Sequence, residues 1–250
     1  MKTVAALSGT YAQEIASLLK RKCDEANFDL QVQEFSVESI PTDFDLLLCD
    51  ANFGAEHLPD YPVQSTQAGL LSCFDVIKKQ GDHYIPDVFA FEALHKCLVK
   101  SGESLDIRFA AYIVVDTWTG VIASAVCAAI GFSEINIITH HRAQAEIWKK
   151  QLNRSFFSLQ IRIIDADAFT SNSNPGSLLI NTIDLKTDSD LAYFNFLRAQ
   201  SLVVDLSANR EESLLRKEAD EAGLISLERQ DVVDALVELV FAFLKEEPSV

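Results

Sequence analysis

The chain has 250 residues, of which 48% are hydrophobic and 23% are charged, and its formal net charge at pH 7 is −16. This composition predicts a folded protein with a substantial core and argues against intrinsic disorder. The acidic balance argues against nucleic acid or an anionic membrane as a partner, because both require a basic face. No apolar stretch reaches about 18 residues, so the sequence predicts no membrane span.

The cysteine and histidine patterns favour a reduced, metal-free protein. The five cysteines are dispersed without a Cys-x-x-Cys pair, which is typical of reduced thiols in a cytoplasmic protein. His57, His83 and His95 show no metal-ligand spacing with one another or with the cysteines. We therefore expect a cytoplasmic protein without a metal site, in which each cysteine is a small core residue.

Apolar periodicity in the N-terminal part of the chain predicts strands that alternate with helices. The predicted strands are Thr3–Leu7, Phe28–Phe35, Phe44–Asp50 and Gly69–Ile77. The predicted helices run from the Ser8-Gly9-Thr10 turn to about Glu25 and from about Asp87 to Lys100. Pro59 and Pro62 predict a loop over Ala51–Ser65, and Lys78–Gly81 is predicted as a turn.

The stretch Arg108–Arg142 contains a complete strand–helix–strand unit. It consists of a buried strand (Phe109–Val115), a tight turn, an apolar helix (Val121–Ile130), a stop at Gly131 and a second buried strand (Ile135–Thr139). Continuous apolar strands joined by a helix indicate a parallel βαβ unit that is covered on both faces.

Further strands and helices alternate through the rest of the chain. The predicted strands are Leu159–Ile164, Leu178–Asn181 and Leu202–Leu206, and the predicted helices are Ala143–Leu152, Ala192–Ala199, Glu211–Ala222 and Asp231–Lys245. This alternation predicts an α/β fold with two α/β domains that share a cleft. We expect a substrate-type domain at residues 1–102, a Rossmann-like nucleotide-binding-type domain at 103–228, and a C-terminal helix at 229–250 that packs back on the first domain.

The turn after the strand Phe109–Val115 departs from the dinucleotide-binding pattern. In that pattern Gly-x-Gly-x-x-Gly follows the strand, so that a pyrophosphate can approach bare backbone at the helix N-terminus. Here the three positions are Trp118, Gly120 and Ala123. We interpret Trp118 as a plug of a vestigial pocket, with a core position or an interaction surface as the alternatives.

Three separated segments resemble motifs of the shikimate dehydrogenases, in that family's order. AGLLSCFD (Ala68–Asp75) with YIPDVFAF (Tyr84–Phe91) is similar to the family's AVNT…GYNTDGxGF region. SLLINTIDLK (Ser177–Lys186) is similar to INTTPLGM. SLVVDLSANREESLL…AGLISLERQDVVDALVELVFAF is similar to the closing VxDxxYxPxxTxLL…GxxMLxxQAxxxF segment. The resemblance implies a two-domain enzyme that reduces 3-dehydroshikimate with NADPH, with the substrate domain first.

The resemblance assigns only one member of the family's catalytic Lys–Asp pair. The Asp of its YNTD motif corresponds to Asp87. The Lys after its VTxPHK strand has no counterpart, because no lysine occurs between Lys22 and Lys78. The two groups should act together at the reacting hydroxyl, so one without the other is not expected to run the same chemistry. The alternative interpretation of Asp87 is an N-cap of the helix that follows Pro86.

The resemblance also implies that other ligand contacts have changed. The AVNT Asn falls on Ser72, and the YNTD Asn and Thr fall on Ile85 and Pro86. In the closing motif, the Tyr falls on Ala208 and the Gln on Leu236. Leucine in place of glutamine removes a side chain that both donates and accepts hydrogen bonds.

On the cofactor side, Thr139-His140-His141-Arg142 occupies the place of the family's NRT stretch, whose Arg accepts the 2′-phosphate of NADP. Arg142 and His140 keep this chemistry available, since a guanidinium suits phosphate recognition. The alternative is a solvated strand end. The resemblance therefore implies either no cofactor or NADP. The candidate cofactor-binding residues are Trp118, Gly120, Ala123, His140 and Arg142.

Two functional hypotheses follow. The first is a divergent shikimate-dehydrogenase-like protein that has lost the ancestral activity and keeps a binding, scaffolding or regulatory role. Its basis is that substitutions fall on functional positions while the apolar pattern survives. The alternative is an NADP(H)-dependent oxidoreductase that acts on a different small polar substrate through Asp87. Expected partners are a small-molecule ligand in the inter-domain cleft and a protein partner or second copy, with neither nucleic acid nor a membrane.

Overall fold

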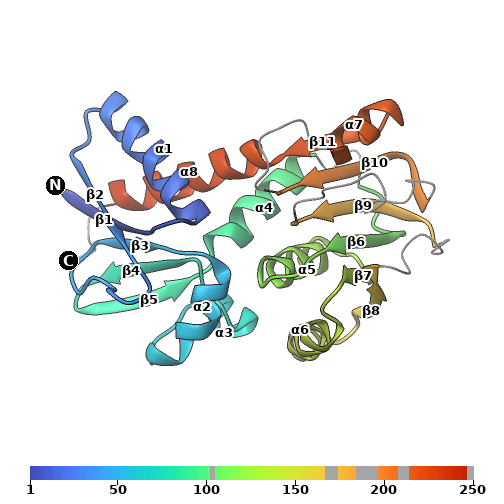
Figure 1. Ribbon diagram of the computed structural model, residues 1–250, viewed down its shortest axis with the longest axis horizontal. Coiled ribbons are helices and arrows are strands. Elements are labelled where there is room, and N and C mark those ends of the chain that lie inside the picture. The colour runs from blue at the N-terminus through green and yellow to red at the C-terminus, as the bar shows by residue number, and fades with distance from the viewer. Residues whose placement is uncertain (102–104, 167–173, 184–195, 208–213, 247–250) are drawn as a thin grey trace. The chain divides into compact units, whose positions relative to one another are not determined.

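The computed structural model describes residues 1–101, 105–166, 174–183, 196–207 and 214–246. The chain forms two compact units, one of residues Met1–Ala93 with Val233–Val250 and one of residues Leu94–Val232. Each unit has its own sheet with helices packed on it (Figure 1), so the predicted α/β class is confirmed.

The first unit contains a five-stranded sheet in the order β2-β1-β3-β4-β5. Its strands are β1 (Lys2–Leu7), β2 (Leu30–Phe35), β3 (Leu46–Leu48), β4 (Val76–Gln80) and β5 (His83–Asp87). β1 pairs in parallel with β2 and β3, whereas β4 runs antiparallel to both of its neighbours. The carboxyl ends of β1, β3 and β5 therefore lie at the edge of the sheet where β4 begins.

Helices cover both faces of this sheet. They are α1 (Tyr11–Glu25), α2 (Ala51–His57), the 3-10 helix η1 (Leu58–Asp60), α3 (Thr66–Leu71), the start of α4 (Phe89–Lys100) and most of α8 (Arg229–Lys245). Figure 1 shows α1 and α8 on one face and α2 and α3 on the other. α1 begins at Thr10, whose hydroxyl accepts a hydrogen bond from the N–H of Ala12. Lys22 of α1 forms an ion pair with Glu238 of α8.

Three sequence predictions in this unit are wrong. The expected loop Ala51–Ser65 begins with α2, because the Asp50 carboxylate caps this helix by accepting two N–H groups of its first turn, both at 2.9 Å. The expected strand Gly69–Ile77 is divided between α3 and β4, with Ser72 in a left-handed conformation between them (φ 55°). The expected turn Lys78–Gly81 is mostly strand, because β4 continues to Gln80 before the chain reverses.

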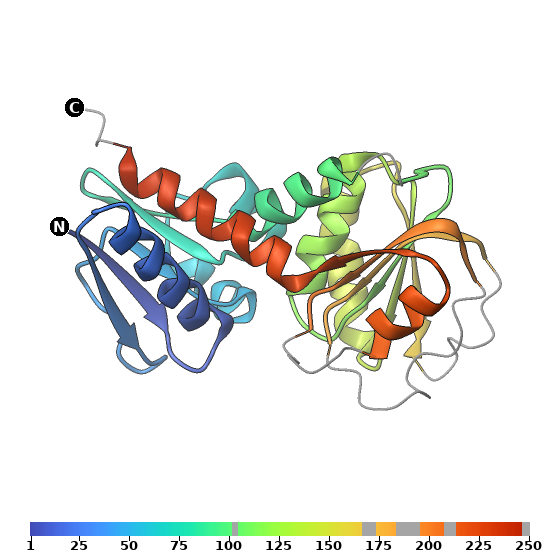
Figure 2. The same cartoon turned by 90° about the horizontal axis from the view of Figure 1, so that it is seen from above.

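The second unit contains a six-stranded sheet in the order β11-β10-β9-β6-β7-β8, and all its paired strands are parallel. The strands are β6 (Ala110–Val114), β7 (Glu134–Thr139), β8 (Gln160–Asp165), β9 (Gly176–Asn181), β10 (Leu197–Asp205) and β11 (Ile225–Glu228). The helices are α5 (Thr119–Ile130), α6 (Arg142–Ser155) and α7 (Leu214–Glu221). Figure 2 shows α5 and α6 on one face of the sheet and α7 on the other, which is the expected Rossmann-like arrangement.

Parts of two predicted helices fall outside the described residues. Residues 192–195 of the expected helix Ala192–Ala199 are not described, and the rest of it leads into β10. Residues 211–213 of the expected helix Glu211–Ala222 are not described, and α7 begins at Leu214. The edge strand β11 was not predicted.

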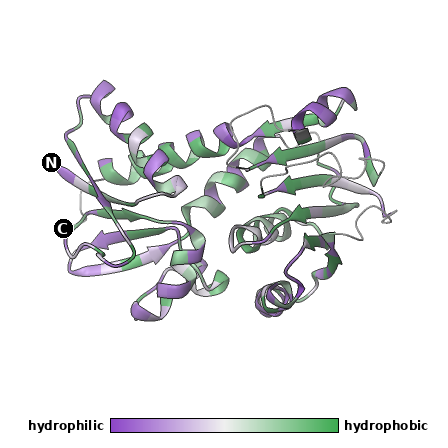
Figure 3. Ribbon diagram, in the orientation of Figure 1, coloured by the Kyte–Doolittle hydropathy of each residue, from purple (hydrophilic) through white to green (hydrophobic). Residues whose placement is uncertain are grey.

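The central strands of the second unit are apolar along most of their length, as the hydropathy colouring of Figure 3 shows. Tyr112, Leu179 and Val203 form a buried cluster on the face covered by α7. On the opposite face α5 approaches β6 at Gly120, where an added Cβ would lie 2.0 Å from the side chain of Val115. Gly120 is therefore required for the close packing of this helix on its strand.

Candidate functional site

Asp87 is the last residue of β5, at the edge of the first sheet where β1 and β3 also end. Antiparallel pairing places Asp87 opposite Val76, and because side chains alternate along a strand, Lys78 projects from the same face as both. The Oδ1 atom of Asp87 accepts a hydrogen bond from the N–H of Val88 at 2.9 Å. The carboxylate is thus fixed beside a strand that carries a lysine.

Lys78 forms an ion pair with Asp87, in which the ammonium Nζ donates to Oδ2. Their side chains are only 16% and 10% exposed. The helix α2, which follows β3, contains no lysine, as the sequence indicated. The sequence pattern does not reveal Lys78 as a partner of Asp87, because Lys78–Gly81 is predicted as a turn. A hairpin register around Gly81 would have placed the lysine beside Asp87.

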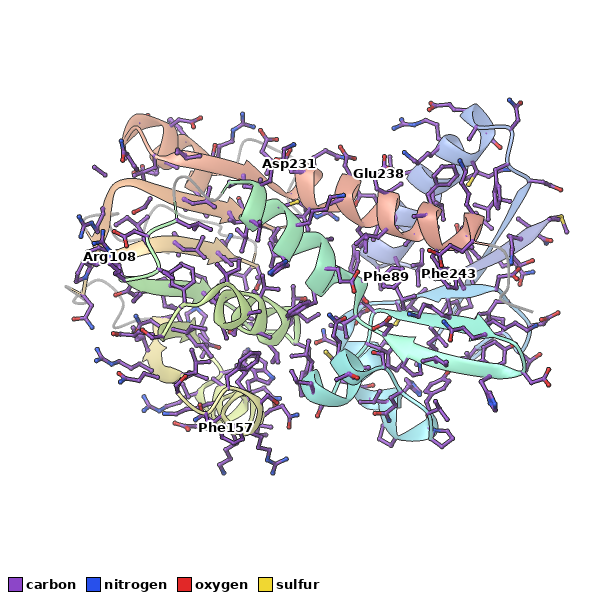
Figure 4. All side chains as sticks on the ribbon, turned by 180° about the vertical axis from the view of Figure 1, so that it is seen from behind. Phe89, Arg108, Phe157, Asp231, Glu238 and Phe243 are labelled. Atoms are coloured by element: carbon purple, nitrogen blue, oxygen red, sulfur yellow. The ribbon has the colours of Figure 1, made fainter. Side chains whose placement is uncertain are left out.

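Two aromatic rings enclose the ammonium of Lys78. Its Nζ lies 5.4 Å from the ring centroid of Phe89 and 5.9 Å from that of Phe243, within the range of cation–π attraction. The rings meet edge to face with centroids 6.4 Å apart. Figure 4 labels both residues, which come from α4 and α8. The ion pair is therefore covered by the helices packed on this face of the sheet.

A second carboxylate, Asp75, lies directly before β4 and is 1% exposed. Its two oxygens accept hydrogen bonds from the N–H groups of Phe89 and Ala90, both at 2.7 Å. Asp75 thus takes the capping role at α4 that was the alternative interpretation of Asp87. Burial raises the pKa of Asp75 to about 7 against the effect of these hydrogen bonds, and the charge of Asp87 adds to the rise.

Three further titratable groups lie near Asp75, namely Tyr11, Cys49 and Cys73. Burial raises the pKa of each of them, and the negative charge of Asp75 adds to the shift. All three stay protonated near neutral pH, and a protonated thiol is a poor nucleophile. All five cysteines of the chain are buried and free, as the sequence predicted.

At the carboxyl edge of the second sheet, Asp116 joins the ends of β6 and β7. Its Oδ1 accepts hydrogen bonds from the hydroxyl of Thr139 at 2.8 Å and from the N–H of His140 at 3.3 Å. The Thr139 oxygen in turn accepts from the N–H of His141 at 3.0 Å. This is the edge at which dinucleotides bind in doubly wound folds. Asp116 was predicted only as part of the turn, because its partners come from the next strand.

Trp118 is the N-cap residue of α5, but its side chain makes no capping hydrogen bond. The indole meets the ring of Trp148 in α6 edge to face, with centroids 6.4 Å apart. The N–H groups of Gly120 and Val121 donate to the carbonyls of Thr117 and Trp118, each at 3.0 Å. A pyrophosphate bound at a helix N-terminus needs such N–H groups as donors, so this turn does not fit one in the usual way.

Apart from Trp118, the predicted cofactor-binding residues fall into two sets. Gly120 and Ala123 are buried within α5, and Gly120 lies directly against the side chain of Val115. His140 and Arg142 are exposed and lie together at the start of α6. Of these residues, only His140 and Arg142 are exposed to solvent.

Within the described part of the chain, no group of three or more His, Cys, Asp or Glu side chains is placed to hold a metal ion. No described helix is both long and apolar enough to cross a membrane. The motif positions Lys186 and Ala208 lie outside the described residues.

Comparison with solved structures identifies the architecture as shikimate-dehydrogenase-like. The quinate dehydrogenase from Corynebacterium glutamicum in complex with NAD matches with a TM-score of 0.83 at 11% identity, over 98% of this chain and 93% of that chain. The shikimate 5-dehydrogenase from Thermus thermophilus in complex with NADP(H) and shikimate matches with a TM-score of 0.76 at 12% identity, over 100% and 95% of the two chains.

A third similar structure is the ligand-free 5-ketofructose reductase of a Gluconobacter strain, with a TM-score of 0.76 at 12% identity, over 98% of this chain and 92% of that chain. No protein-family model matches the sequence, and no curated protein sequence matches it. At these identities the likeness shows the fold alone. The chain has the two-domain, shikimate-dehydrogenase-like α/β fold that its three motifs predicted.

Proposed function

We propose that this chain has lost the ancestral reduction of 3-dehydroshikimate by NADPH and retains a binding, scaffolding or regulatory role. The state of Asp87 carries the proposal. A carboxylate that moves a proton at a substrate hydroxyl needs an oxygen within hydrogen-bond reach of it. Here one oxygen accepts from Val88 and the other from Lys78, in a pair that is almost wholly buried.

The turn after β6 supports the same proposal. NADPH supplies the hydride in the reaction of the dehydrogenases. In this chain Trp118 replaces the first glycine of the pyrophosphate loop, and carbonyls of the turn already accept the N–H groups of Gly120 and Val121. The part of the ancestral nucleotide site that stays open is the corner with His140 and Arg142. We expect a small-molecule ligand or a protein partner to contact that corner.

An assay of the purified chain with 3-dehydroshikimate and NADPH tests the proposal. We expect no oxidation of NADPH, followed by its absorbance, above the rate without protein. The Thermus thermophilus shikimate 5-dehydrogenase in the same buffer is the positive control. Turnover by this chain that disappears in the Asp87→Asn variant would contradict the proposal.

A second candidate function is an NADP(H)-dependent oxidoreductase that acts on a different small polar substrate. The observation that favours it is the Lys78–Asp87 pair, which supplies an ammonium beside the carboxylate from a different strand than in the dehydrogenases. The exposed Arg142 is suited to a 2′-phosphate.

A cofactor titration decides between the two candidates. The oxidoreductase should show quenching of tryptophan emission and a rise in melting temperature with NADPH, more strongly than with NADH. Arg142→Ala should remove this preference, whereas Arg154→Ala, at the exposed other end of α6, should not. No quenching and no thermal shift with either cofactor would count against the oxidoreductase.

A further inference from the structure

The second unit has a cavity of about 400 Å³ at the end of its sheet where β6, β9 and β10 begin, opposite to the end with Asp116 and Trp118. This volume is in the range of small-molecule sites. Figure 4 labels Arg108, which lies at this end of the sheet. The lining residues that matter here are polar: Asp106, Arg108, Ser177, Arg198, Gln200 and Ser201.

Irregular strand pairing accompanies the cavity. β9 carries Ser177 as an extra residue against β6, and β10 carries four residues, 198–201, opposite that single serine. Gln200, within this bulge, has a left-handed backbone with φ 68°. A residue with a side chain adopts that conformation only at an energetic cost. Bulges and strained residues are concentrated at functional sites, so this end of the sheet is a candidate for one.

The buried serines of the cavity are fixed by the backbone. Ser177 donates its hydroxyl hydrogen to the carbonyl of Asp106 at 2.7 Å, and Ser201 donates to the carbonyl of Gly176 at 3.1 Å. Both residues are buried. These hydrogen bonds hold the bulged strands in place. We therefore expect a ligand to be recognised by the charged side chains at the opening of the cavity.

The charges at the opening are unequal. Arg108 binds the Asp106 carboxylate through two hydrogen bonds, both 2.7 Å long, which hold the pKa of Asp106 down at about 2. Arg198 stacks on the ring of Phe109, with its guanidinium carbon 3.7 Å from the ring centroid. Among the described residues Arg198 forms no direct ion pair, although its charge adds to the lowering of the pKa of Asp106. Two arginines against one aspartate leave one net positive charge in a chain whose net charge is −16.

We propose that this cavity binds the oxyanion of a small organic phosphate or carboxylate, with Arg198 as the principal contact. A guanidinium stacked on an aromatic ring keeps its N–H edge free and pre-oriented for two parallel hydrogen bonds to an oxyanion. The Asp106–Arg108 pair neutralises the one carboxylate that would repel such a ligand. The site is independent of the proposed function, because it lies at the other end of the sheet.

Isothermal titration of the full chain tests the site with three probes, namely inorganic phosphate, glycerol 3-phosphate and succinate. We expect at least one of them to bind, and Arg198→Ala to weaken its binding about tenfold or more. The affinity of Arg198→Lys should lie between those of Arg198→Ala and the unaltered chain, because a lysine keeps the charge but cannot form two parallel hydrogen bonds to one oxyanion. The probe that binds more tightly identifies phosphate or carboxylate as the preferred group.

Arg154→Ala removes an equally exposed arginine outside the cavity and is the matched control, which should bind as the unaltered chain does. Melting temperatures of all variants show whether they are folded. If Arg198→Ala does not fold, the salt dependence of binding by the unaltered chain replaces it, and affinity should fall as ionic strength rises. The absence of binding by all three probes, or binding that Arg198→Ala or salt leaves unchanged, would overturn the proposal.

Discussion

The charged side chains at the carboxyl edges of the two sheets differ in burial. In the first unit, Asp75 and the Lys78–Asp87 pair are almost wholly buried, and their charged atoms are satisfied by partners within the chain. In the second unit, His140 and Arg142 at the start of α6 are exposed. The charged side chains of the first edge are buried, whereas His140 and Arg142 at the second edge face solvent. The contrast shows that charged side chains at the edge of a sheet can be buried where partners within the chain satisfy them.

Removing one partner of the buried pair should have the largest effect. We expect Asp87→Ala to lower the free energy of unfolding by about 3 kcal/mol, because it leaves the Lys78 ammonium enclosed without a counter-charge. Urea denaturation followed by circular dichroism measures the change. Lys78→Met added to Asp87→Ala should recover part of the loss, since the unpaired charge is then gone.

The exposed ion pair of the neighbouring residue Lys79 provides the control. Lys79 Nζ lies 2.8 Å from Asp43 Oδ1, but these side chains are 37% and 87% exposed. Asp43→Ala should therefore destabilise the protein much less than Asp87→Ala does, because solvent screens this exposed pair. Equal losses in Asp43→Ala and Asp87→Ala would mean that the first edge is as open as the second, and the comparison would fail.

The second effect depends on pH and comes from Asp75. Its pKa in the folded protein is raised from 3.8 to about 7. Its contribution to stability is therefore fully present below about pH 4 and is lost as the pH rises towards 7. Relative to Asp75→Asn, which cannot ionise, the unaltered chain should lose about 1.4 kcal/mol for each pH unit across this window.

Denaturation of both proteins at a series of pH values measures this difference. The Asn side chain keeps one oxygen to accept an N–H of α4, so the variant is expected to fold with a lower but flatter stability curve. If the free energies of unfolding of the two proteins change with pH in parallel, Asp75 is solvated and does not belong to the buried charged residues of the first edge.

A smaller effect is expected at Trp118, whose side chain is neither fully buried nor fully exposed. Its indole is partly exposed but packs edge to face on Trp148. Trp118→Ala should lower the free energy of unfolding by about 1 kcal/mol beyond the loss of buried area, and Trp118→Phe should lower it much less. If Trp118→Ala is neutral in thermal unfolding, the ring contact is not part of the core.

The sequence supported prediction of the fold where the signal is local and continuous. The apolar strands β6 and β7 and the stop at Gly131 follow directly from such a signal, because a fully buried parallel strand needs no partner to be recognised. The helix α2 was missed, because Pro59 and Pro62 suggested a loop while the cap at Asp50 went unnoticed. A short helix with one good cap has too weak a periodicity to outweigh two prolines.

The candidate site was less predictable, because its contacts join separate elements. Asp87 could be identified from its motif, but Lys78 reaches it only through the register of a hairpin. Asp75 caps a helix that begins 14 residues later, whereas capping preferences concern the residue directly before a helix. The cofactor roles of Trp118 and Arg142 stay predictions, since a ligand's position does not follow from the sequence of a turn.

The smallest effect should occur at the exposed residues of the second edge. Arg142 begins α6 in solvent, so Arg142→Ala should change the free energy of unfolding by less than about 0.5 kcal/mol, as Arg154→Ala should at the other end of the helix. Removing a cation from a helix N-terminus relieves a mild repulsion with the helix dipole, so the sign should be slightly stabilising. Thermal denaturation at low and high salt measures this stabilisation, which should become smaller at high salt because salt screens the charge–dipole repulsion. A loss above about 1 kcal/mol would place Arg142 in a structural network like that of Asp87, and the second edge would then be closed as well.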